Sequence, residues 1–497
     1  MEISLKREEI LELCGKDPEA IVSIIQRQEE IIERQDQTSA TLTERIVQLE
    51  IRIAELEARL NQHSRNSNRP PSMDGFRRPK SQRKKGERPP GGQKGHKGQT
   101  LAWVETPDQV RVHTVTECED CGTSLELVEP FKVERRQVHD LPPLKVLVTE
   151  HQAVQKTCPR CGRQNRALFP LEVKYPVQYG QNLKALMVYL CIYQLLPYDR
   201  LCETFSDLFG RSMSKATLVR AVSECSRNLA GVEEKIRDLL ADAQVLNVDE
   251  TGMRVNGIRQ WLHVASTEIL TSYGHHRKRG SQAMDDLQIL PRFRGTMIHD
   301  FWAPYFRYQS RHALCNAHLL RELKGITENY RQKWSEQLYD LIQEIKDAVD
   351  EVCEHSCTLD PQQITDFQER YRQIIESGMQ ENPVPEGSGA ILKRGRKKQS
   401  KAKNLLDRCQ KYDREILSFM YDFSVPFSNN LAERDIRMMK LQQKISGTFR
   451  SEEGAAWFCR VRGYISTVKK NEMPVFASLL KAFEGNPFIP SAAHRSG

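Results

Sequence analysis

The sequence predicts a multidomain α+β protein, and three observations support this prediction. Its 497 residues are too many for one ordinary hydrophobic core. The N-terminal segment has helical periodicity, and two Cys-x-x-Cys pairs that follow it are typical of a small metal-bound module. From about residue 243, short apolar strands alternate with a helix and further strands, which indicates an α/β core.

Composition narrows the class of protein. The formal net charge of +8 is modest for this length, and the basic residues are unevenly distributed. The longest apolar run, residues 185–196, is too short to span a bilayer, and the charged N-terminus lacks a secretion signal. Thirteen cysteines, an odd number, favour reduced thiols over a disulfide framework. We therefore expect a cytoplasmic protein without a membrane anchor.

Apolar residues near the N-terminus follow a heptad seam. Their spacing alternates between four and three residues at Leu42, Ile46, Leu49, Ile53, Leu56 and Leu60. The same register continues backwards through Ile32, Ile25 and Ile21, with interruptions at Gln28, Gln35 and Ser39. The pattern predicts a coiled coil within residues 1–65 that pairs copies of the chain. The alternative is an amphipathic helix that packs on its own protein.

Residues 66–108 form a segment rich in proline, glycine, lysine and arginine. Such a composition cannot bury enough apolar surface to fold alone. It predicts a flexible basic linker, which either follows DNA phosphates or only keeps neighbouring domains apart.

Two Cys-x-x-Cys pairs, each followed by glycine, predict a zinc ribbon over residues 109–170. The four thiolates are Cys118, Cys121, Cys158 and Cys161. Tetrahedral Zn²⁺ takes this ligand set, whereas a redox dithiol would need only one pair. Because the gap between the pairs is long, we expect a small β-ribbon to bring them together, with structural zinc stabilising the module.

Residues 171–242 are predicted to be helical. Within them, Gly210 suits a bend and Ser214 suits the N-cap of a second helix, a pattern that resembles a helix-turn-helix. The second helix either reads a DNA major groove or has a purely structural role.

Three acids stand at positions that suit metal ions. Asp249 and Asp300 each end an apolar strand, and the Thr-Gly pair that follows Asp249 by two residues is predicted to turn the chain. Glu433 lies on a predicted helix and shares one face with Arg437 and Lys440. Three converging carboxylates would hold two Mg²⁺ or Mn²⁺ ions for phosphoryl transfer. Glu250 points to the opposite side of its strand and is expected to support the site from behind. The alternative for the helix is ordinary surface ion pairing.

The order of motifs resembles the transposases of the insertion-sequence-66 family. The stretches that carry the resemblance are NSNRPPS, GGQKGHKG, the two cysteine pairs, NVDETG, HDFWAPY, CNAHLLREL and NNLAERDIR. The resemblance implies a ribonuclease H-like catalytic core with its Asp-Asp-Glu triad on Asp249, Asp300 and Glu433, and a basic residue seven positions later at Lys440. It also includes a Cys-x-x-His stretch, Cys315 and His318, to which no role is assigned. The plain structural account is a buried strand cysteine and a histidine that stacks near the active site. Arg69 stands where a lysine is more usual.

These observations combine into a domain plan. In chain order it comprises a coiled coil (1–65), a basic linker (66–108), a zinc ribbon (109–170), a helix-turn-helix-like DNA-binding region (171–242), the first part of a ribonuclease H-like core (243–326), a helical insertion with a basic loop (327–425) and the core helix with a C-terminal element (426–497). The expected partners are double-stranded DNA, both element ends and target, a second copy of the chain and small accessory proteins of the same element. The expected location is the nucleoid of a prokaryote.

Two other functions fit parts of the pattern. A zinc-containing DNA-binding regulator would use the acids only structurally. A metal-dependent nuclease would cut DNA without joining it.

Overall fold

The computed structural model describes residues 7–16, 18–67, 101–142, 144–383 and 399–491. Most of the predicted basic linker and the basic loop at 384–398 lie outside the described residues. The chain divides into two compact units, Arg77–Gln178 with Tyr198–Lys215, and the remainder. The larger unit holds a mixed sheet with its helices, a helical bundle and the N-terminal helices.

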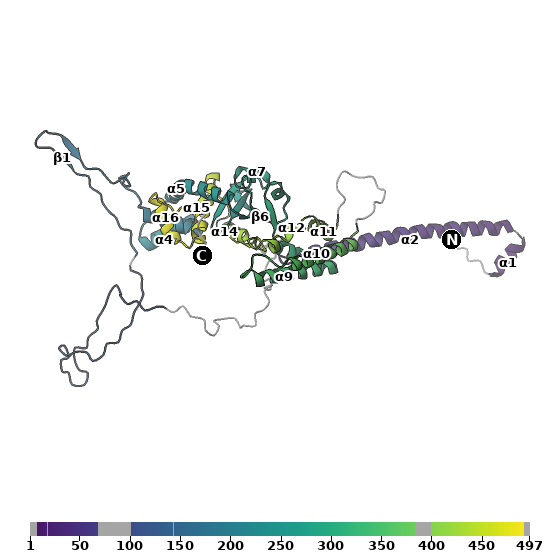
Figure 1. Ribbon diagram of the computed structural model, residues 1–497, viewed down its shortest axis with the longest axis horizontal. Coiled ribbons are helices and arrows are strands. Elements are labelled where there is room, and N and C mark those ends of the chain that lie inside the picture. Colours follow the sequence, from purple (N-terminus) through teal and green to yellow (C-terminus); the bar gives the residue numbers. More distant parts are fainter. Residues whose placement is uncertain (1–6, 17, 68–100, 143, 384–398, 492–497) are drawn as a thin grey trace. The chain divides into compact units, whose positions relative to one another are not determined.

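The heptad segment lies on one long helix. Helix α2 (Pro18–Leu60) follows the short α1 (Arg7–Lys16) and runs for 43 residues (Figure 1). The seam residues Leu42 to Leu60 remain between 45% and 85% exposed. The C-terminal end of α2 contacts the helical bundle: Ala58 is buried, and the side-chain amide of Asn66, just beyond α2, donates to Glu328 on helix α8 (Asn316–Tyr330). The seam is therefore not packed on its own protein over most of its length.

The predicted helical region is confirmed from Gln181 onward. It contains α3 (Gln181–Val188), the π-helical turn η2 (Tyr189–Tyr193), α4 (Tyr198–Phe209), α5 (Lys215–Asn228) and α6 (Ala230–Ala241). Gly210 ends α4 with a φ of 61°, a conformation that glycine adopts without strain. The predicted bend between two helices is therefore at the expected residue.

A five-stranded mixed sheet forms the centre of the larger unit. Its strands are β3 (Val245–Val255), β4 (Ile258–Ser266), β5 (Thr271–His276), β6 (Thr296–His299) and β7 (Arg311–Leu314). They lie in the order β5-β4-β3-β6-β7. The first three form an antiparallel meander, whereas β6 and β7 run parallel to β3. The strand texture expected from residue 243 is thus confirmed.

The predicted turn at Thr251–Gly252 is wrong. Strand β3 continues through both residues, which pair with Leu262 and Trp261 of β4. The chain turns instead at Asn256 and Gly257, with φ values of 50° and 76°. Asn-Gly is the preferred two-residue hairpin turn because both positions need positive φ, so the sequence itself carries the signal for a turn at this point.

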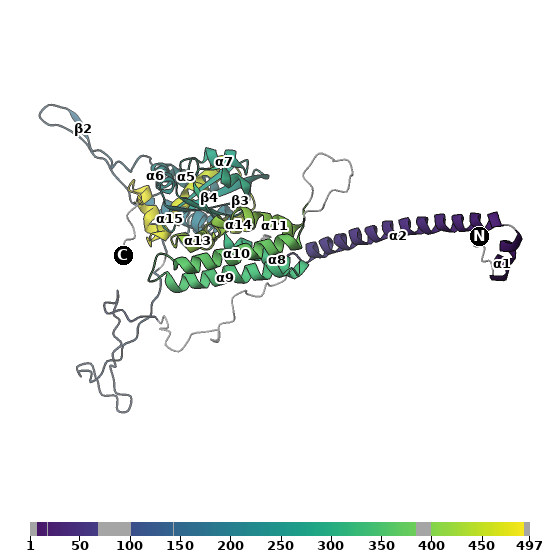
Figure 2. The ribbon, with the colours of Figure 1, turned by 45° about the vertical axis from the view of Figure 1, so that its right-hand side comes forward.

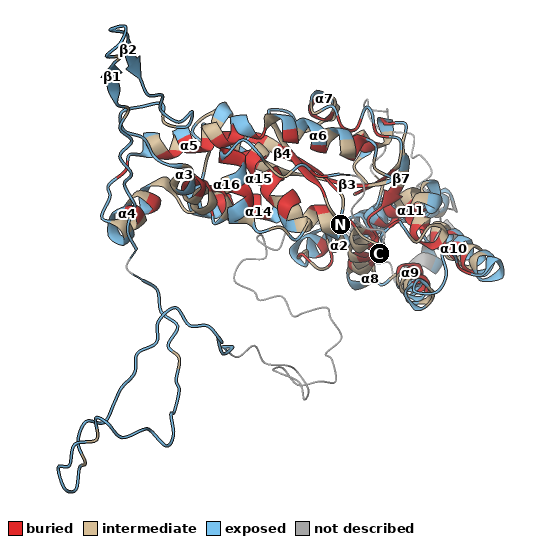
Figure 3. Cartoon of the chain, turned by 60° about the vertical axis from the view of Figure 1, so that its left-hand side comes forward, coloured by how far each residue is buried: buried red, intermediate tan, exposed pale blue. Residues whose placement is uncertain are grey.

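Helices cover both faces of the sheet (Figure 3). On one face, α14 (Asn430–Ser446) packs against β3 and β4, and α15 (Glu452–Lys470) packs against β5. On the other face, α7 (Ser281–Asp286) and the residues after it approach β5, where Leu287 lies against Gly274. The C-terminal helix α16 (Val475–Phe483) packs on α3.

A helical bundle stands between β7 and α14 in the sequence. It comprises α8, α9 (Lys333–Val352), α10 (Pro361–Glu381), α11 (Lys401–Lys411), α12 (Asp413–Ile416) and α13 (Ser418–Tyr421). Helices α8, α9 and α10 lie side by side (Figure 2), around a core that includes the fully buried Trp334. The helices begin at Asn316, earlier than the predicted start at residue 327, because Cys315 directly follows β7 and precedes the first turn of α8.

Gly295, directly before β6, supports a testable expectation. A Cβ atom there would lie 2.3 Å from the Gln244 carbonyl oxygen and 2.6 Å from that of Ala243. Both obstacles are backbone atoms, so Gly295→Ala should destabilise the unit by about 1–3 kcal/mol, measured by thermal unfolding. The control Gly231→Ala meets open space in helix α6 and should be neutral or stabilising by up to ~1 kcal/mol. Equal unfolding temperatures for both variants would contradict this account of the sheet.

Candidate functional site

Asp249 lies on β3 just beyond the last residue that pairs with β6, Asn247. Asp249 pairs with Val264 on β4, which in turn pairs with Tyr273 on β5, so these three side chains lie on the same face of the sheet. The Tyr273 hydroxyl donates to the Asp435 carbonyl of α14 at 2.7 Å, which shows that this is the face covered by α14. Burial raises the pKa of Asp249 well above its usual range, and the negative charges of Glu250, Asp300 and Glu433 raise it further. Asp249 therefore lies close enough to Asp300 and to Glu433 for their charges to act on it.

Asp300 directly follows the parallel strand β6. Its carboxylate accepts a hydrogen bond from the Trp302 amide at 2.9 Å, at the start of the helical turn η3 (Ala303–Arg307). Burial raises the pKa of Asp300, while Trp302, Arg279 and Arg408 counteract this shift. The carboxyl ends of parallel strands are the usual location of ligand sites in such sheets.

Glu433 lies in the first turn of α14, and an amide network fixes this helix to β3. Asn429 donates from its side chain to the Val248 carbonyl at 2.7 Å and accepts from the Asn247 side chain at 2.9 Å. Its backbone amide donates to the Cys315 sulfur. Asn429 occupies the N-cap position, but its side chain makes no cap hydrogen bond. Asn429 therefore uses its side chain to fix the start of α14, and with it Glu433, to β3.

This network leads to a stability prediction. Asn429→Ala removes the hydrogen-bond partner of both the Val248 carbonyl and the Asn247 side-chain amide. Each buried group left without its partner costs about 1–3 kcal/mol of folding free energy. We expect a loss of roughly 2–5 kcal/mol in unfolding free energy, measured by denaturant titration. The adjacent Asn430→Ala is the matched control, because Asn430 is exposed. Similar losses in both variants would show that the amide network contributes little.

Glu250 lies on the opposite face of β3 from Asp249, as its alternation along the strand predicts. Arg279 donates to it through Nε at 2.9 Å, and the Tyr305 hydroxyl donates to its other oxygen. The guanidinium of Arg279 also stacks on Trp261 and Trp302, with centroid distances of 4.9 and 4.2 Å. Sequence reasoning missed this cluster, because its members come from four separate segments and carry no local pattern.

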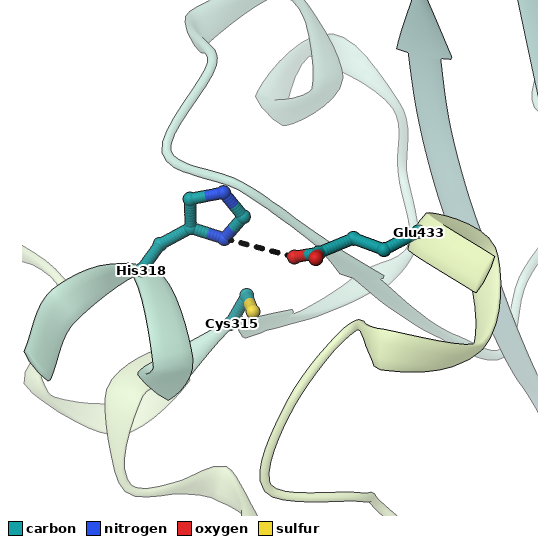
Figure 4. Close-up of side chains that lie close together, drawn as sticks. All are labelled: Cys315, His318 and Glu433. Atoms are coloured by element: carbon teal, nitrogen blue, oxygen red, sulfur yellow. Dashed lines mark ion pairs between the residues drawn. The ribbon is translucent and has the colours of Figure 1, made fainter. Parts of the chain in front are cut away.

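The two basic residues predicted beside Glu433 differ in their surroundings. Lys440 donates to the Gly252 carbonyl at 3.2 Å, and burial, followed by the charge of Arg259, lowers its pKa. Arg437 is exposed on α14. His318 is closer to Glu433 than either, with 3.6 Å between its Nδ1 and the carboxylate (Figure 4). Burial and then Arg321 lower the pKa of His318 to about 3, so its imidazole is neutral.

The comparisons with known proteins bear on this arrangement. Residues 176–457, more than half of the chain, match the profile described as the transposase IS66 family. The chain belongs to the IS66 family of transposases. Residues 116–162 match the zinc-finger binding domain of transposase IS66, and residues 17–102 match a family of unknown function. A search of curated proteins finds no match. The family resemblance read from the sequence is therefore confirmed, and DNA is the partner that it implies.

The zinc-finger match includes all four predicted cysteine ligands of the transposase. In each turn the glycine amide donates to the carbonyl of the first cysteine at 2.9 Å, Gly122 to Cys118 and Gly162 to Cys158. Both glycines have a φ of 70°. Hydrogen bonds, the largest with Thr123, lower the pKa of Cys121, and those with Cys161 and Arg160 lower the pKa of Cys158. Each turn therefore favours thiolates, and the match indicates structural zinc.

Among the described residues, each turn has its own strand pairing, and the ribbon predicted to join the two turns stays a prediction. Strands β1 (Gln155–Thr157) and β2 (Gln164–Arg166) form a hairpin around the second turn alone, while the first has an isolated bridge between Glu117 and Ser124. The four sulfurs do not form one ligand cluster within the described residues. Such small modules receive most of their folding free energy from the metal ion itself.

No helix in the described part of the transposase is long and apolar enough to cross a membrane.

Proposed function

We propose that this transposase is of the Asp-Asp-Glu type and performs metal-dependent strand cleavage and 3′-hydroxyl strand transfer. The observation that supports this most is the placement of three acids: Asp249 lies just beyond the pairing of β3 with β6, Asp300 directly follows β6, and Glu433 lies in the first turn of α14, which Asn429 ties to β3. Half-buried carboxylates that converge in this way favour a cation between them, and their hard oxygens suit Mg²⁺ or Mn²⁺. When bound, the ions would activate the attacking oxygen and stabilise the leaving oxygen.

The sheet order supports a ribonuclease H-like core. The mixed sheet, with an antiparallel meander β5-β4-β3 beside parallel β6 and β7, fits the ribonuclease H-like core that the family resemblance implies. The bundle from α8 to α13 would be the insertion that precedes the glutamate helix. In this arrangement, Asp249 lies just beyond the part of β3 that pairs with β6, Asp300 directly follows β6, and α14 would close the site from one face.

The protein's own residues would position DNA at these acids. Arg437, exposed three residues before Lys440 on α14, would contact a phosphate near the site. Arg279 would keep Glu250 and Trp302 in place, and Trp302 in turn holds Asp300 through its backbone amide. Positioning and charge stabilisation carry most of the catalysis in phosphoryl transfer, so no covalent protein–DNA intermediate is needed.

The remaining domains would bind the ends of the element. The zinc module, the basic linker and the helices around Gly210 would hold the terminal repeats, while the coiled coil would pair two protomers that each carry one end. Small accessory proteins of the same element would complete the assembly.

A strand-transfer assay tests this proposal. The full chain is incubated with a labelled duplex that carries the element's end, a plasmid target, and Mg²⁺ or Mn²⁺. Joined product that depends on the metal is the expected result. Cleavage without joining would indicate a nuclease, and binding without cleavage would indicate a regulator; either outcome would contradict the proposal.

The exposed seam of α2 predicts self-association. Leu49 is 61% exposed in the single chain, so Leu49→Asp costs the monomer little. In a dimer the substitution would remove two buried leucine side chains, one from each copy, and cost about 3 kcal/mol or more of association free energy. The dissociation constant of the dimer should therefore rise by over ~100-fold. Sedimentation measures the change, with the adjacent Gln48→Asp as the control on another helix face. A monomeric wild-type chain, or equal dimerisation of both variants, would contradict a seam that pairs two copies.

A further inference from the structure

Cys315, His318 and Glu433 form a compact cluster of potential ligands. Their sulfur, nitrogen and oxygen atoms all lie within 4.8 Å of one another, the single such group of three or more among the described residues. Cys315 precedes the first turn of α8 and His318 lies within that turn, so the Cys-x-x-His spacing places both on the side facing α14 (Figure 4). Cys315 is fully buried, and the other two side chains are only about one-fifth exposed, at 19% and 21%.

Two polar atoms in this cluster are buried without hydrogen-bond partners. They are Nδ1 of His318 and Oε1 of Glu433, which face each other. Their separation of 3.6 Å is too long for a hydrogen bond, and Arg321 approaches the same oxygen only to 3.7 Å. Buried polar groups are nearly always paired, so two facing atoms without partners call for a bridging ligand.

We propose that Cys315, His318 and Glu433 bind a transition-metal ion of the zinc class, separate in chemistry from the magnesium site. Across a tetrahedral zinc with bonds of ~2.0–2.1 Å, nitrogen and oxygen ligands lie roughly 3.4 Å apart, close to the separation of His318 and Glu433. Thiolate and imidazole favour zinc over magnesium, which prefers oxygen alone. The Asn429 amide, which donates to the Cys315 sulfur, would stabilise a bound thiolate. Three protein ligands leave a fourth position open.

This site would regulate the transposase, a consequence that rests on the proposed function. Glu433 has one carboxylate, and the zinc site shares it with the proposed Asp-Asp-Glu triad. An ion held by Cys315 and His318 would draw this carboxylate away from Asp249 and Asp300. Zinc would therefore inhibit strand transfer, and its removal would restore activity.

Zinc content tests the site independently of catalysis. The full-length wild type, Cys315→Ser and His318→Gln are dialysed at one fixed free zinc concentration, and bound zinc is measured by mass spectrometry. Both variants should lose one ion per chain relative to the wild type. The control Cys409→Ser alters another buried thiol outside the cluster and should keep the wild-type content. If Cys315→Ser fails to fold, His318→Gln decides, and an unchanged zinc content in it would overturn the site.

Strand transfer tests the regulatory consequence. Added zinc should reduce wild-type joining in Mg²⁺ by at least about tenfold. Substitutions of residues that orient metal ligands change metal affinity or activity by a similar factor. Joining by His318→Gln, relative to its own activity without zinc, should change far less. Equal inhibition of both chains would overturn competition for Glu433. An absence of joining in every chain would contradict the proposed function instead, while the zinc content would still decide the site.

Discussion

Replacing Asp249 with asparagine is expected to abolish strand cleavage and joining while leaving DNA binding intact. The substitution keeps the size of the side chain but removes the charge that would hold the catalytic cation. Loss of metal stabilisation costs several kcal/mol of barrier, which corresponds to a thousandfold or larger drop in rate. The strand-transfer assay measures this drop, and a gel-shift titration measures binding.

Asp286→Asn is the matched control. Asp286 ends α7 with a side chain that is 57% exposed, where it pairs with His276. The same change of charge there should leave joining within about twofold, since surface substitutions alter free energies by roughly 0.5 kcal/mol or less. Joining by Asp249→Asn at a similar level would show that Asp249 holds no essential cation.

Removal of the structural zinc is expected to have the second large effect. A chelator, or Cys121→Ser combined with Cys161→Ser, should unfold the module at residues 116–162, which lacks an extensive apolar core: Leu127 is fully exposed, and Val128 and Val138 are also largely exposed. Zinc contributes about 10–16 kcal/mol to comparable modules. If this module holds the terminal repeats, the affinity for the element's end should fall toward the affinity for unrelated DNA. In specific DNA-binding proteins the first affinity exceeds the second by a factor of about 10³–10⁷.

Cys357→Ser provides the control, because this thiol is exposed and lies in the helical bundle region. Its zinc content and DNA selectivity should match the wild type. The sheet unit should melt at the same temperature in all these chains, since it forms a separate compact unit. Full selectivity for the element's end after loss of both cysteines would assign recognition to another domain.

Much of the fold could be predicted from local signals in the sequence. Heptad spacing predicted the helix that became α2, Gly210 predicted a bend, and apolar runs predicted the strands of the sheet. The predicted end of the strand at Gly252 was wrong, because β3 loses its pairing with β6 near Asp249 but keeps its pairing with β4. An acid can therefore lie at the edge of a parallel pair in the middle of an antiparallel ladder.

The supporting residues of the site could not be predicted, because they depend on tertiary contacts. Nothing in the sequence near Asn429 indicates that its side chain contacts Val248 and Asn247, which lie about 180 positions earlier in the chain. Arg279 contacts Glu250 across 29 positions in the sequence, and neither residue carries a pattern that predicts the pair. His318 was noted through its spacing from Cys315, but only the fold shows that both face Glu433.

The position of a bound divalent ion tests the central claim most directly. Crystals of the full chain with an element-end duplex and Mn²⁺ would locate the ion by anomalous scattering, since Mn²⁺ accepts the same oxygen ligands as Mg²⁺. We predict an anomalous peak between the carboxylates of Asp249 and Asp300, with Glu433 as a further ligand. Mn²⁺ bound elsewhere on the chain, with no peak between these carboxylates, would contradict the assignment of the catalytic site.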